Sequence, residues 1–107
     1  MTGFDEREKA IEAKYEHDEE MAFKVRSRRR KLLGMWAAER LGLKGPDADA
    51  YAEGLAALGL HRGGDEEEVQ HIARDFAAKG VALDTTRIKL ECDRFEREAK
   101  AQLGVLN

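Results

Sequence analysis

The spacing of apolar residues along this 107-residue chain predicts four helices. In four stretches the apolar positions recur three or four residues apart, as they do on one face of a helix. These stretches are residues 21–41, 48–58, 69–77 and 88–103. The loops between them have about four to six residues, a length typical of antiparallel neighbours in helical bundles. We therefore predict an all-α fold, an antiparallel four-helix bundle over residues 21–107, with Trp36, Phe76 and Phe95 as its largest core residues.

Glycine, proline and acidic residues mark the ends of the predicted helices. Pro46 suits the first turn of the second helix, and Asp84 suits the N-cap of the fourth. Asp65 and Glu68 form a capping pair for the third helix. The helices are expected to end or break at glycines, namely Gly42, Gly45, Gly59, Gly63, Gly64 and Gly80.

The first twenty residues follow a different pattern. Residues 5–20 contain good helix formers, no glycine or proline, and eight acidic residues against three basic ones. Phe4, Ile11 and Tyr15 are separated by seven and four residues, so a helix would place them on one side. Such a sparse stripe gives little to pack, and an unpacked helix is marginally stable. We predict a mobile helical arm, residues 1–20, whose stripe fills a groove on a partner protein; the alternative is a solubilising acidic tail.

A basic run follows the arm directly. It contains Lys24, Arg26, Arg28, Arg29, Arg30 and Lys31. Five of these side chains are candidates for a docking patch that binds a protein or the phosphates of ATP or ADP, namely Arg26, Arg28, Arg29, Arg30 and Lys31. The alternative is a solvated helix face paired with acids such as Glu20. Nucleic acid is not expected as a partner, because core positions interrupt the run, no aromatic residues interleave it, and an acidic arm lies beside it.

Composition narrows the class of protein. Charged residues make up 38% of the chain, more than the usual quarter or so, and the surplus lies in the arm and the basic run. Cys92 is the single cysteine, which excludes an internal disulfide and suits a reducing cytoplasm. The charged N-terminus is unlike a signal peptide, and no apolar run approaches membrane-spanning length. We expect a cytoplasmic protein, a monomer when free, without direct membrane insertion.

The chain lacks the residue patterns of common catalytic sites. His17, His61, His71 and Cys92 do not have the spacing of a metal site. Ser27 is the single serine, so a Ser-His-Asp triad is implausible, and no phosphate-binding loop is present. The many carboxylates are expected on solvent-facing surfaces, where nothing would raise a pKa. We therefore expect no enzyme, no metal and no required cofactor.

Several segments resemble the zeta subunit of alphaproteobacterial F-type ATP synthases, a family long described as a domain of unknown function. They are Phe4-Asp5-Glu6-Arg7-Glu8, Glu12-Ala13-Lys14-Tyr15, His17-Asp18 and the block from Arg29 to Glu39, Arg-Arg-Lys-Leu-Leu-Gly-Met-Trp-Ala-Ala-Glu. The resemblance extends over essentially the whole chain, although the C-terminal half matches by pattern rather than by a motif.

The resemblance implies a regulatory inhibitor of ATP hydrolysis. Its N-terminal arm would insert as a helix between an alpha and a beta subunit of the catalytic head, near the gamma subunit, and oppose rotation in the hydrolytic direction. The protein would then be peripheral to the inner membrane through the ATP synthase. Residues implied as apolar anchors are Phe4, Ile11 and Tyr15, and those implied as polar contacts are Asp5, Arg7, Glu8, Lys14, His17 and Asp18.

Overall fold

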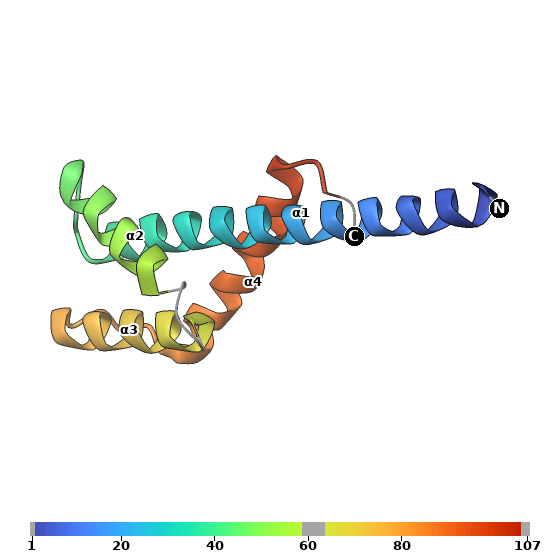
Figure 1. The fold of residues 1–107 in the computed structure, drawn as a ribbon. Coiled ribbons are helices and arrows are strands. Elements are labelled where there is room, and N and C mark those ends of the chain that lie inside the picture. The colour runs from blue at the N-terminus through green and yellow to red at the C-terminus, as the bar shows by residue number, and fades with distance from the viewer. Residues whose placement is uncertain (1, 59–63, 106–107) are drawn as a thin grey trace.

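Four helices make up the described part of the protein. The computed structural model describes the backbone of residues 2–58 and 64–105 and the side chains of residues 18–58 and 65–105. The helices are α1 (Thr2–Arg40), α2 (Pro46–Leu58), α3 (Gly64–Lys79) and α4 (Thr85–Gln102). Successive helices reverse direction, and α4 crosses α1 obliquely (Figure 1). The predicted all-α fold and the predicted order of helices are confirmed.

Backbone geometry explains where three of the helices stop. Gly42, Gly80 and Gly104 have φ values of 80°, 75° and 70°, in the left-handed region that favours glycine. After Gly42, the N–H of Leu43 donates back to the carbonyl of Ala38 at 2.9 Å, which closes the last turn. Equivalent hydrogen bonds follow the glycines at the ends of α3 and α4. The predicted stops at Gly42 and Gly80 are therefore confirmed, whereas Gly59 and Gly63 lie outside the described residues.

The two acidic caps predicted from the sequence have different outcomes. Asp84 caps α4, because its Oδ1 accepts a hydrogen bond from the backbone N–H of Arg87 at 3.0 Å. Asp65 was predicted as the cap of α3, but α3 already begins at Gly64, so Asp65 lies inside its first turn. Its carboxylate is instead bound by arginines of α1. The cap prediction at Asp65 is wrong because a tertiary ion pair replaces the local hydrogen bond.

An aromatic cluster lies at the centre of the core. The rings of Trp36 and Phe76 meet edge to face, with centroids 5.7 Å apart, and those of Trp36 and Phe95 are 6.5 Å apart. All three side chains are buried, as the sequence predicted. The cluster joins α1, α3 and α4, and Leu33 and Leu55 extend it towards α2. Burying aromatic rings in this geometry contributes both apolar area and edge-to-face attraction.

The N-terminal part of α1 extends beyond the other helices (Figure 1). A helix of 39 residues is about 60 Å long at about 1.5 Å per residue, close to the 66 Å length of the molecule. Side chains at 18–20 are exposed, Met21 is half-buried, and Val25 is the first described α1 residue that is buried. Residues 2–20 therefore continue the same helix away from the body. Their predicted mobility stays a prediction.

Gly34 allows α1 and α2 to approach closely. A methyl group added at Gly34 would lie 2.8 Å from Cα and 2.9 Å from Cβ of Ala52. The atom it would meet is backbone, which cannot rotate away. Close helix packing at this point therefore requires glycine on α1 and a small residue on α2.

Gly34→Ala is expected to lower the free energy of unfolding by roughly 1–3 kcal/mol, because the added methyl forces the two helices apart. Gly54→Ala is the matched control, since nothing lies within 4 Å of its added methyl. That control should stabilise the protein by roughly 0.5–1 kcal/mol through helix propensity. Urea unfolding followed by circular dichroism measures both. Equal effects of the two substitutions would contradict the close-approach role of Gly34.

Candidate docking site at the base of the arm

The predicted partner-binding residues lie along the first five turns of α1. Asp18 is exposed. The side chains of the others lie outside the described residues, although their backbone is helical; these are Phe4, Asp5, Arg7, Glu8, Ile11, Lys14, Tyr15 and His17. The helical register places Phe4, Ile11 and Tyr15 on one side of α1. Their contacts with a partner stay a prediction.

The structure divides the basic run into two groups. Arg29 is only 8% exposed, and the side chain of Arg30 is 11% exposed, so both lie inside the protein. Arg26, Arg28 and Lys31 are exposed, and Arg28 donates a hydrogen bond to Gln102 at 3.0 Å. A docking or nucleotide patch built from this run would therefore present Arg26, Arg28 and Lys31 to a ligand, without Arg29 and Arg30.

Arg29 and Arg30 form an ion-pair cluster with the first turns of α3, in which Glu68 is buried and Asp65 is exposed. Arg29 Nη2 lies 2.6 Å from Asp65 Oδ1, and Arg30 Nη2 lies 3.5 Å from the same oxygen. Arg30 Nε lies 2.9 Å from Glu68 Oε1, an ion pair without a well-aligned hydrogen bond. α1 packs chiefly on α2 and α4, and these arginine side chains add to the contact that Trp36 makes with Phe76 of α3. The cluster fixes α3 against α1 just past the arm.

Burial dominates the chemistry of Glu68. The residue is 1% exposed, and burial raises the pKa of its carboxyl from 4.5 to about 7, against the opposing charges of Arg30 and Arg29. The prediction that all carboxylates face solvent is therefore wrong for Glu68, and also for the buried Glu91. The burial of Glu68 could have been predicted from its spacing. Glu68 precedes Ile72 and Phe76 by four and eight residues, which places it on the core side of α3.

Glu68→Gln should change how stability depends on pH. Between pH 4.5 and about 7 the folded protein retains a proton that the unfolded chain has lost, so stability falls as pH rises through this window. The variant lacks this titration. Its free energy of unfolding, relative to the parent, should therefore rise by roughly 1–3 kcal/mol from pH 5 to pH 8.

Glu67→Gln is the control, because Glu67 is an exposed neighbour on the same helix turn. Urea unfolding of the parent and both variants at several pH values gives the comparison. Parallel pH profiles for the parent and Glu68→Gln would show that Glu68 does not titrate as burial requires.

A second polar cluster joins α2 to α3. The hydroxyl of Tyr51 donates to Asp75 Oδ2 at 2.8 Å, and His71 Nε2 lies 3.1 Å from the same oxygen. Burial, followed by the hydrogen bond to Asp75, raises the pKa of Tyr51 well above its usual range. His71 thus contacts a carboxylate on its own helix, whereas His61 lies outside the described residues. The cluster ties α2 to α3.

Cys92 lies on the core side of α4, as predicted. It is half-buried, and burial raises the pKa of its thiol to about 11. At neutral pH the thiol is therefore protonated, which makes it a poor nucleophile. Its role in the structure is that of a small apolar residue packed against the core.

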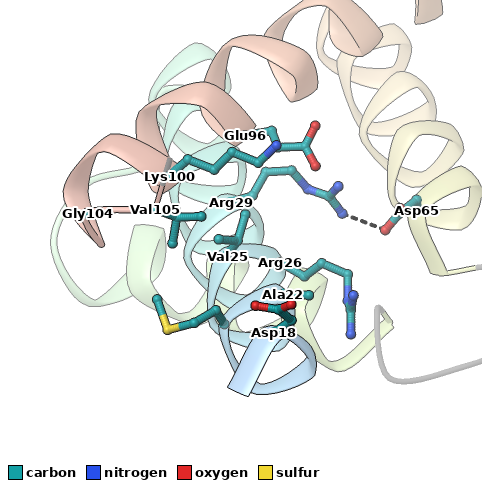
Figure 2. A pocket seen from close by; sticks show the side chains of 11 residues that line it. Asp18, Ala22, Val25, Arg26, Arg29, Asp65, Glu96, Lys100, Gly104 and Val105 are labelled. Atoms are coloured by element: carbon teal, nitrogen blue, oxygen red, sulfur yellow. Dashed lines mark hydrogen bonds and ion pairs between the residues drawn. The ribbon is translucent and has the colours of Figure 1, made fainter. Parts of the chain in front are cut away.

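A groove opens where the arm leaves the body. It has a volume of about 690 Å³ and lies between α1, the end of α4 and the start of α3. Figure 2 shows Val25 near its centre, Val105 and Gly104 on the α4 side, and Ala22 and Asp18 towards the arm. Arg29 reaches past Val25 to Asp65, so the ion-pair cluster forms one end of the groove. The site thus has an apolar floor and a charged rim.

The fold and this groove define a small all-α protein with a helix that projects from its body. The family model for ATPase inhibitor subunit zeta matches residues 1–102, so the chain belongs to that family. The match includes the arm, the basic run and all four helices. A comparison with curated proteins gave no match.

Two absences hold within the described part of the chain. None of its helices combines the length and the apolar character that crossing a bilayer requires. Nor do three or more His, Cys, Asp or Glu side chains come together there in a way that could hold a metal ion.

Proposed function

We propose that this protein inhibits ATP hydrolysis by the F-type ATP synthase. In this proposal residues 1–20 insert as a helix between an alpha and a beta subunit of the catalytic head, near the gamma subunit, and block rotation in the hydrolytic direction. The family name, which describes an inhibitor subunit of an ATPase, supports the general activity. The protein acts by occupying space and needs no catalytic group of its own.

The observation that carries the proposal is the continuity of α1. One helix runs from Thr2 to Arg40 without a break, so the arm and the core-forming segment are parts of one element. Leu33, Trp36 and Ala37 fix its C-terminal half in the core. The arm can resist rotation only if its C-terminal end is held in place. The packing of the C-terminal half of α1 in the core would hold it.

The sequence of the arm suits a groove between protein subunits. Phe4, Ile11 and Tyr15 share one side of the helix and would be the apolar anchors. The arm's polar contacts would be Asp5, Arg7, Glu8, Lys14, His17 and Asp18. Ordering a segment on binding costs about 2–5 kcal/mol, so buried anchors are needed to offset it.

The nucleotide alternative gains no specific support from the structure. Arg29 and Arg30 are already paired with carboxylates of α3. Of the exposed cations, Arg28 hydrogen-bonds Gln102, and the groove beside Arg26 also contains three carboxylates, those of Asp18, Asp65 and Glu96. A triphosphate would be repelled by those carboxylates. Weak ATP or ADP binding to the run stays an untested prediction.

Deleting residues 2–19 should abolish inhibition of ATP hydrolysis by the isolated synthase head while the four-helix body stays folded. The body should stay folded because, among the side chains that the structure describes, every buried core residue lies at or beyond Val25. Steady-state hydrolysis measures inhibition, and thermal unfolding followed by circular dichroism checks the fold. A truncated protein that inhibits as well as the full chain would disprove the role of the arm.

Ile11→Glu should raise the concentration for half-maximal inhibition at least about tenfold, because burying one aliphatic side chain is worth roughly 1.5–3 kcal/mol. Ala13→Glu is the matched control: it adds the same charge two residues along, on the opposite side of α1. The control should shift the value less than about twofold. Similar losses from both substitutions would indicate that the stripe does not face the target.

A further inference from the structure

The side of α1 that carries Phe4, Ile11 and Tyr15 continues into the groove at the base of the arm. Phe4, Ile11, Asp18 and Val25 follow one another at intervals of seven residues, so they lie on the same side of α1. Tyr15 and Ala22 are also seven residues apart, and they lie on the neighbouring row of side chains along α1. Asp18, Ala22 and Val25 line the groove. A partner segment lying along the arm's stripe would therefore reach the groove without changing direction.

The groove has the make-up of a protein interface. Its floor is apolar, with Val25 buried beneath the opening and Met21 and Val105 half-buried at its sides. Charged side chains of both signs surround the groove. They include the cations Arg26 and Lys100 and the anions Asp18 and Glu96. An apolar centre within a mixed polar rim is typical of protein–protein contacts. The carboxylates disfavour a phosphate or a nucleic acid as the occupant.

The groove lies where two helices cross obliquely. In Figure 1, α4 crosses α1 and its last turn stands beside the point where the arm departs. The groove lies between them, lined on the α1 side by Ala22 and Val25 and on the α4 side by Lys100 and Val105 (Figure 2). A helix laid there would pack its side chains between α1 and α4, as an amphipathic helix does in a groove.

We infer that this groove receives an amphipathic helix of the inhibited enzyme, packed against Val25 and Val105 alongside the arm. The inference rests on the proposed function and extends it. The protein binds its target at two adjoining places, along the arm and in the groove at the base of the arm. The apolar face of that helix covers the floor, and its charged residues pair with Arg26, Lys100, Asp18 and Glu96 around the rim. The arm blocks rotation, and the groove adds affinity.

Two substitutions block the groove from its two walls. Ala22→Arg places a long side chain on the α1 wall, and Val105→Arg places one on the α4 wall, distant in sequence from the arm. Ala50→Arg is the matched control, because Ala50 is exposed on α2, which does not line the groove. Arginine is a good helix former, so α1 should retain its stability. Thermal unfolding of the full-length variants checks this.

Each groove variant should raise the concentration for half-maximal inhibition of the synthase head at least about tenfold, while the control shifts it less than about twofold. Maximal inhibition should be unchanged, because the arm still inserts. If the full chain inhibits and loses inhibition when residues 2–19 are removed, yet both groove variants match Ala50→Arg, the groove inference is overturned and the proposed function stands. If the full chain does not inhibit, the proposed function itself fails.

A photoreactive side chain introduced at position 22 identifies the occupant directly. In the complex with the synthase head it should crosslink to a subunit of the head, and the same probe at position 50 should not. A crosslink to a second copy of this chain, or no crosslink from position 22, would overturn the inference.

Discussion

The structure depends on the packing of the C-terminal half of α1 between the other three helices. Leu33, Trp36 and Ala37 are buried there, and the edge-to-face contacts of Trp36 with Phe76 and Phe95 join α1 to α3 and α4. Because the N-terminal half belongs to the same helix, this packing also fixes the direction in which the arm leaves the body. The arm needs no apolar contact with its own domain to be positioned.

Electrostatic contacts complete the attachment of α3. Arg29 and Arg30 reach from α1 to Asp65 and Glu68, and the burial of Glu68 is unfavourable enough to raise its pKa to about 7. A buried ion pair of this kind adds little net stability but strongly disfavours arrangements in which one partner is left unpaired. We interpret the cluster as a device that sets the position of α3. Asp65, one of its members, also lines the groove at the base of the arm.

The sequence was sufficient for the fold because local signals and tertiary structure agree over most of the chain. Apolar spacing identified the core positions of all four helices, and glycine and Asp84 marked ends that the backbone geometry confirms. The sequence analysis failed at Asp65 and Glu68. Acidic residues near a helix start suggest a capping pair, but here both carboxylates pair with arginines of α1. Local pattern cannot report a partner that lies 36 residues away, as Arg29 does from Asp65.

The groove was beyond sequence analysis for a similar reason. Its walls come from the start of the α1 body, the end of α4 and the first turn of α3, which only the fold brings together. The same is true of Gly34, whose importance lies in the closeness of Ala52 on α2. The stripe formed by Phe4, Ile11 and Tyr15, in contrast, could be identified from spacing alone.

Amide hydrogen exchange of the full-length protein, free and bound to the synthase head, tests the division between arm and body most directly. The account predicts that binding slows exchange over residues 2–20, while amides of α1 from Leu33 onward, already protected by the core, exchange as before. Slowed exchange confined to α2 and α3, with residues 2–20 unchanged on binding, would contradict it.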